Sequence, residues 1–118
     1  MTQEEIIEGN KLITQFLGLT IITDGISLFD TNYKPLAKYH ESWNDLMSVV
    51  EKIESLPLIN DAGICVLIEH SYCRIYLDNW GDYTTVAENA TKKNKLSAVY
   101  LSVIEFIKWY NKNLKLKQ

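Results

Sequence analysis

The sequence predicts an α+β fold in which three amphipathic helices pack on an antiparallel sheet of about three to four strands. Three segments repeat apolar residues at helical spacing, two strand-like segments are joined by only two residues, and helices and strands stand in separate blocks. A length of 118 residues fits a single domain, 1–118. We expect the layers to be helix, sheet and helix.

The first helix is predicted between Thr2 and Gly18. Thr2 followed three residues later by Glu5 forms a capping box, and Gly18 is typical of the position just after a helix. The apolar stripe of this helix passes through Asn10, and Gly9 lowers the helix propensity in the middle. The helix is therefore expected to need packing against the rest of the domain.

Two further helices have equally clear boundary signals. Ser42 is the predicted N-cap of the second helix, which Pro57 closes, and Asn94 is the predicted N-cap of the third. The apolar stripe of the second helix comprises Trp43, Leu46, Met47, Val50 and Ile53. The wider stripe of the third comprises Leu96, Val99, Tyr100, Val103, Phe106, Ile107 and Tyr110. Ser102 lies largely off that stripe, and Trp109 lies at its edge.

Two strands, 63–69 and 72–78, are predicted on either side of a His70-Ser71 turn. In this register one face is fully apolar and must be core, and it carries Ile64, Val66, Ile68, Cys73, Ile75 and Leu77. The other face is mixed, and it carries Cys65, Leu67, Glu69, Tyr72, Arg74 and Tyr76. Because Cys65 and Cys73 point to opposite faces, we expect no disulfide between them.

Two further strand regions are less sharply defined. Residues 83–86 suit a third strand of the sheet, and the polar segment 87–94 is predicted to be irregular. Within 20–31, Asp24-Gly25 is a two-residue hairpin signal between short apolar arms. This segment is either one small hairpin or a strand followed by a loop.

Composition places the protein among cytoplasmic globular domains. Hydrophobic residues make up 47% and charged residues 23%, which excludes a disordered or collagen-like chain. The longest apolar run, 64–68, is far shorter than the roughly 20 residues a membrane span needs. The acidic start of the chain is unlike a signal peptide, and two cysteines fit free thiols in a reducing compartment.

The charges are unevenly distributed along the chain. Residues 1–91 carry a net charge of −9 and residues 92–118 a net charge of +6. A basic segment can bind nucleic acid, but the seven basic residues of 92–118 are all lysines. Arginine, which forms bidentate hydrogen bonds with phosphates and base edges, is absent from this segment. We therefore expect no specific nucleic-acid binding, because the acidic body also repels phosphate.

Several segments resemble a known group of proteins. These segments are Asn10–Ile13 with Phe16-Leu17-Gly18, Tyr39–Trp43, Val49–Glu54, Ala98–Tyr100 and Ile104–Asn111. Together they look like the small phage and prophage proteins grouped as a phage α-β-α sandwich domain, whereas 61–94 matches nothing in that group. The resemblance implies a layered α+β fold and a phage or prophage origin. It supplies no catalytic residues.

Recognisable catalytic and metal-binding patterns are absent from the sequence. No CxxC or HxxxH spacing, nucleophile elbow or glycine-rich phosphate loop occurs, so we expect no enzyme activity, no metal and no cofactor. One cluster is worth a hypothesis: Tyr39, His40 and Trp43, with Tyr33 nearby, precede and begin the second helix. Such side chains suit recognition, and a helix N-terminus favours an anion. In the alternative interpretation, Trp43 is a core residue and the tyrosines brace a loop.

Two classes of function follow from these observations. The first is a non-catalytic accessory or interaction module of phage or prophage origin, which binds another copy of itself or another protein. The second is a protein that binds a small ligand or nucleotide through the region around Tyr39, His40 and Trp43. A convergent pocket would favour the second class, and an exposed apolar patch would favour the first.

Overall fold

The computed structural model describes residues 1–19, 21–23, 28–29, 37–57 and 62–113. The elements are α1 (Gln3–Phe16), β1 (Ile22–Thr23), β2 (Leu28–Phe29), α2 (Trp43–Ser55), β3 (Gly63–Glu69), β4 (Tyr72–Asn79), β5 (Asp82–Ala90) and α3 (Lys95–Asn113). Strands β3, β4 and β5 form an antiparallel sheet in that order. The α+β class and the predicted strand number are confirmed. Within the described part of the chain, no helix is long and apolar enough to cross a membrane.

The predicted helix boundaries are confirmed by their hydrogen bonds. Thr2 and Glu5 exchange two bonds of 3.1 Å in a complete capping box, and these bonds lower the pKa of the Glu5 carboxyl. The side chains of Ser42 and Asn94 each accept a backbone N–H from the first turn of their helix. Gly18 follows α1 with a φ of +84°, a conformation that favours glycine.

The register of the β3–β4 hairpin is the predicted one. Glu69 pairs with Tyr72 across the two-residue turn, and Gly63 pairs with Asp78 at the far end. The predicted core face is confirmed, since Ile64, Cys73 and Ile75 are buried and Val66, Ile68 and Leu77 pack against the core. Cys65 and Cys73 are both free and lie on opposite faces, as predicted.

Strand β5 is longer than the sequence predicted. It continues to Ala90, so the expectation that residues 87–94 are irregular is wrong for its first four positions. A bulge at Val86 explains the error: Ile75 pairs with Ala87, whereas the next residue, Tyr76, pairs with Thr85. The extra residue shifts the phase of the alternation, which hides the second half of the strand from a period-two pattern.

The segment around Asp24-Gly25 contains a small hairpin, although with another register. Thr23 pairs with Leu28, whereas a two-residue Asp24-Gly25 turn requires Thr23 to face Ile26. Asp24, Gly25 and Ile26 themselves lie outside the described residues. The choice between a hairpin and a strand with a loop is therefore decided in favour of a hairpin.

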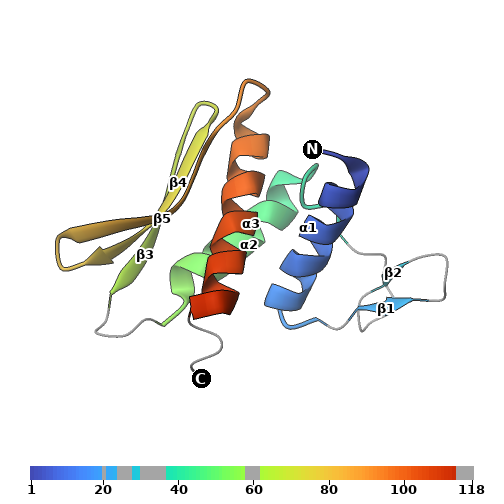
Figure 1. Ribbon diagram of the computed structural model, residues 1–118, viewed down its shortest axis with the longest axis horizontal. Coiled ribbons are helices and arrows are strands. Elements are labelled where there is room, and N and C mark those ends of the chain that lie inside the picture. The colour runs from blue at the N-terminus through green and yellow to red at the C-terminus, as the bar shows by residue number, and fades with distance from the viewer. Residues whose placement is uncertain (20, 24–27, 30–36, 58–61, 114–118) are drawn as a thin grey trace.

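The helices form two layers on one side of the sheet, which differs from the expected order of helix, sheet and helix. Helix α3 packs on β4 and β5, α2 packs on β3, and α1 packs on α3 (Figure 1). The apolar face of the sheet attracts both α2 and α3 because it offers the larger apolar area. No described helix covers the mixed face.

Three side chains lie where the helical stripes did not place them. Ser102 is fully buried rather than off the stripe, because α3 is covered on two sides, by the sheet and by α1. Its hydroxyl donates to the Cys73 carbonyl at 3.1 Å and accepts from the Asn89 side-chain amide at 3.0 Å. Trp43 is 39% exposed instead of belonging to the core, whereas Val49, absent from the predicted stripe, is fully buried.

Gly9 allows α1 to approach Tyr100 of α3 closely. A Cβ atom at this position would lie 2.3 Å from the Tyr100 hydroxyl, so no larger residue fits without movement. The packing of Tyr100 therefore explains why a residue of low helix propensity stands in the middle of α1.

Candidate functional site

The three side chains of the predicted site do not converge on one cavity. Tyr39 is buried in the core with 5% exposure, and Trp43 is exposed at the start of α2. His40 lies between them in sequence and is the one that lines a hollow at the surface. Tyr33 lies outside the described residues. The alternative interpretation is wrong about Trp43, which is not a core residue.

His40 belongs to a hydrogen-bonded network with α1 and α3. Tyr100 donates its hydroxyl to Asn10 Oδ1 at 3.0 Å, and the Asn10 amide nitrogen lies 3.1 Å from His40 Nδ1. Because the amide nitrogen can only donate, this contact assigns Nδ1 as the acceptor and Nε2 as the N–H position of the ring. That nitrogen lies 3.4 Å from the Glu41 carboxylate. The network orients the imidazole and joins three segments.

Tyr100 is the centre of this network. It is almost fully buried, and its hydroxyl also lies within hydrogen-bond distance of the Ile6 carbonyl, at 3.2 Å. Burial raises the pKa of Tyr100 to about 12, so the hydroxyl keeps its proton to higher pH than an exposed tyrosine does. The role of Tyr100 is to hold α1 against α3.

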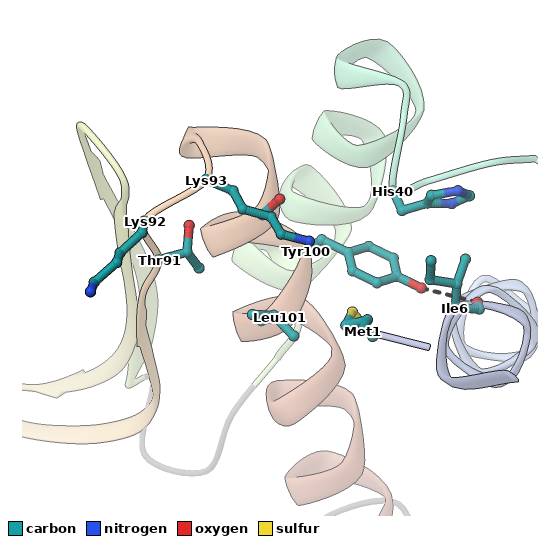
Figure 2. Close-up of a pocket in the computed structure, with 9 residues that line it drawn as sticks. Met1, Ile6, His40, Thr91, Lys92, Lys93, Tyr100 and Leu101 are labelled. Atoms are coloured by element: carbon teal, nitrogen blue, oxygen red, sulfur yellow. Dashed lines mark hydrogen bonds between the residues drawn. The ribbon is translucent and has the colours of Figure 1, made fainter. Parts of the chain in front are cut away.

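The hollow beside this network has a volume of about 430 Å³. Its walls come from the N-terminus, α1, the segment before α2, the β5–α3 connection and the first turns of α3: Met1, Ile6, His40, Thr91, Lys92, Lys93, Ser97, Tyr100 and Leu101. Figure 2 shows Lys93 extending toward Tyr100, whereas the Lys92 side chain points away. The hollow therefore combines an apolar wall with positive charge near a helix N-terminus, a chemistry that suits a small anion.

Two observations concern metal and thiol chemistry in the described residues. No three His, Cys, Asp or Glu side chains in this part of the chain come together as metal ligands. Burial raises the pKa of the Cys73 thiol to about 11, so it is protonated at neutral pH and a poor nucleophile.

A second candidate surface is the mixed face of the sheet, here called the open face. It comprises Cys65, Leu67, Glu69, Tyr72, Arg74, Tyr76, Asp78, Tyr83, Thr85 and Glu88. The Arg74 guanidinium lies over the Tyr76 ring at 4.7 Å, and the Tyr83 ring meets Tyr76 edge to face at 5.6 Å. Arg74 Nε also donates to Thr85 Oγ1 at 2.7 Å. The Tyr76 ring is thus held in position by Arg74 on its own strand and by Tyr83 on the neighbouring strand.

Large apolar groups remain accessible on and beside this face. Tyr83 is 61% exposed and Leu67 is 37% exposed. Trp80, in the β4–β5 turn, is 83% exposed and has a φ of 56°, an uncommon conformation for a side chain of this size. Asp78 steadies this turn by accepting the Gly81 N–H at 3.0 Å. The turn presents an indole ring at one end of the open face.

The open face carries more negative than positive charge. Its carboxylates are Glu69, Asp78 and Glu88, and its one cation is Arg74. Glu88 also accepts a short hydrogen bond from the Tyr72 hydroxyl, which raises the pKa of Tyr72. The face is therefore aromatic and acidic, a combination that attracts cations and repels phosphate.

Sequence reasoning missed the contributions of Tyr100, Lys92 and Lys93 to the hollow. The helical pattern assigned Tyr100 to the core, and its ring is indeed buried. Lys92 and Lys93 were identified only as part of the basic segment 92–118, without a role in a site. The alternating pattern did identify the mixed face, without indicating whether anything covers it.

Comparison with known proteins adds no relative: the chain matches no family model, no curated protein and no solved structure. The resemblance to phage α-β-α sandwich proteins therefore stays a prediction.

Proposed function

We propose that this protein is a non-catalytic interaction module of phage or prophage origin that binds a basic protein surface through its open face. The observation that carries this proposal is the sheet face that no described helix covers, on which tyrosines and an acidic rim stand beside an exposed tryptophan. The phage or prophage origin rests on the sequence resemblance alone.

The chemistry of the face selects the kind of partner. Tyrosine and tryptophan supply large, rigid contact areas and are enriched at interface hot spots. Three carboxylates against one arginine attract lysine and arginine side chains, which also stack on aromatic rings. The same charge balance disfavours a nucleic acid, whose phosphates would meet Glu69 and Glu88. A protein segment rich in arginine satisfies both the rings and the carboxylates.

Nuclear magnetic resonance tests the proposal with a defined probe. The ¹⁵N-labelled protein is titrated with an eight-residue peptide of alternating arginine and serine, and separately with its glutamate–serine counterpart. We expect shifts for the amides of β4 and β5 with the basic peptide, and none with the acidic peptide. Shifts of equal size with both peptides, or shifts confined to the helices, would contradict the proposal.

Two variants sharpen this titration. Tyr83→Ala removes an exposed ring of the open face and is expected to weaken binding at least several-fold. Ile7→Ala, at a residue that is 39% exposed on α1, removes apolar area elsewhere and is expected to leave binding unchanged. Equal effects of the two substitutions would remove the open face from the interaction.

A second function is favoured by the hollow beside His40. Its volume lies within the range of about 300–1,000 Å³ that small-molecule sites occupy, and Lys93 supplies a cation. Adenosine monophosphate and adenosine are suitable probes, because they differ only in the phosphate. Specific binding predicts shifts at Tyr100 and Lys93 with the phosphate form alone, abolished by Lys93→Ala and kept by Lys108→Ala. Identical behaviour of the two probes excludes an anion site.

A further inference from the structure

The two edges of the three-stranded sheet differ in how they meet solvent. On β5, a bulge at Val86 interrupts the edge, and the Glu88 N–H lies 3.4 Å from the Glu105 carboxylate of α3. Asp82 and Glu88 add charge to that strand. Bulges, charges and covered backbone groups are the devices that keep an edge strand from pairing with another chain.

Within the described part of the chain, strand β3 has none of these devices between its ends. Its sequence is Gly-Ile-Cys-Val-Leu-Ile-Glu, with one charge, at the last residue, and no bulge in its pairing with β4. No described strand pairs with its outer side. An apolar, regular edge strand of this kind is a template for pairing.

The hairpin geometry determines which backbone groups face outward. Glu69 and Tyr72 flank the two-residue turn and form a hydrogen-bonded pair, and such pairs alternate with non-bonded ones along an antiparallel hairpin. The residues of β3 that turn their N–H and C=O away from β4 are therefore Ile64, Val66 and Ile68. These three form a row of backbone donors and acceptors along the edge.

We propose that β3 pairs antiparallel with β3 of a second copy of this chain, about a two-fold axis at Val66. In this register Val66 faces its own counterpart, and Ile64 faces Ile68 of the second copy. All three residues have outward backbone groups, so they form the hydrogen-bonded pairs of the new ladder. On the open face, Cys65 meets Leu67 of the second copy. The inference goes beyond the proposed function and does not depend on it.

Self-complementarity selects a second copy over an unrelated strand. The register brings apolar residues opposite one another at all five inner positions, and it places Glu69 opposite Gly63 rather than opposite another carboxylate. Like charges directly across a ladder destabilise it, and here none meet. A two-fold axis also satisfies both strands with the same contacts.

Helix α2 contributes a second layer to this interface. It is the helix that packs on β3, so a chain joined through β3 brings its own α2 alongside. Lys52 of α2 stacks on Phe16 of α1 at 5.2 Å, and Trp43 and Met47 lie on the opposite flank of the helix. Trp43 is 39% exposed and Met47 is partly buried, so this flank presents apolar area for the two helices to share.

Analytical ultracentrifugation of the full chain, with a pair of matched double variants, tests the inference. The wild type is expected to dimerise weakly, with dimers populated by about 200 μM, because a short strand pair lies at the small end of specific interfaces. Cys65→Lys with Leu67→Lys places like charges opposite each other and should weaken the dimer at least tenfold. Cys65→Lys with Leu67→Glu places opposite charges there and should restore it.

The pair is matched because both variants replace the same two open-face residues with charged ones, and circular dichroism reports whether each is folded. A wild type that is monomeric at this concentration overturns the inference, as does equal dissociation of the two variants.

If either double variant unfolds, cross-linking of the single variant Leu67→Cys serves as the test. Oxidation with diamide should then link it to Cys65 of the second copy, whereas Tyr83→Cys should stay unlinked. The reverse result also overturns the inference.

This outcome is separable from that of the proposed function. A monomer that still binds the arginine–serine peptide contradicts the dimer alone. A dimer that ignores the peptide contradicts the open-face proposal alone.

Discussion

The two faces of the sheet share the same strands and yet differ in almost every physical property. The inner face is closed by α2 and α3, and its residues Ile64, Cys73 and Ile75 are at most 5% exposed. The open face consists of rings, hydroxyls and charges that satisfy one another while remaining accessible. The comparison teaches that the inner face provides stability, whereas the open face keeps rings and charges accessible, which the proposed recognition requires.

The strongest test of the inner face is a charge placed in its helix layer. Val103 is fully buried in α3, so Val103→Asp leaves a carboxylate without a partner and should cost about 3–5 kcal/mol of a total stability of about 5–15 kcal/mol. Lys108→Asp, on the exposed side of the same helix, should cost less than about 1 kcal/mol. Urea unfolding measures both. Equal losses would mean that α3 does not face the sheet as described.

A smaller change in the free energy of unfolding distinguishes a residue on the inner face of β4 from one on the open face of β3. Ile75→Ala empties a fully buried position of β4 and should lower the free energy of unfolding by about 2–5 kcal/mol. Leu67→Ala removes an aliphatic side chain of the same size from the open face and should cost about 1 kcal/mol or less. Thermal unfolding of both variants makes the comparison. A larger loss from Leu67→Ala would show that something covers the open face.

The smallest expected effect is a difference in thiol chemistry between the faces. Iodoacetamide at neutral pH should modify Cys65 and spare Cys73. Burial raises the pKa of the Cys73 thiol from 9.0 to about 11. Since the folded state holds this proton more tightly than the unfolded chain, its stabilising contribution is complete below about pH 9 and is lost as the pH rises toward 11. Mass spectrometry counts the alkylated sites, and modification of both thiols in the folded protein would contradict the assignment of faces.

Much of the fold was predictable because short-range signals determined it. The His70-Ser71 turn determines the β3–β4 register, and the caps at Thr2, Ser42 and Asn94 determine where helices begin. These signals lie within a few residues of the structure they specify. For that reason they are readable without knowledge of the tertiary contacts.

The wrong predictions share a physical cause: contacts between residues far apart in sequence determine these features of the structure. The bulge at Val86 changes the phase of β5. Ser102 is buried between the sheet and α1, where Asn89 and the Cys73 carbonyl satisfy its hydroxyl. Neither is visible in a local pattern. The same holds for the candidate site, because the hollow joins His40 to Tyr100, far apart in sequence.

The attachment of α1 has a consequence for how the molecule assembles. The Tyr100 hydroxyl meets its acceptors in α1, the Asn10 side chain and the Ile6 carbonyl, across 90 and 94 positions of the chain, whereas β3, β4 and β5 are joined by two-residue turns. Closing a long loop costs more entropy than closing a short one, and the cost must be met before the contact forms. The three-stranded sheet and α3 are therefore expected to form the folding nucleus. Helix α1 is expected to dock afterwards, when the Tyr100 hydroxyl packs against Gly9.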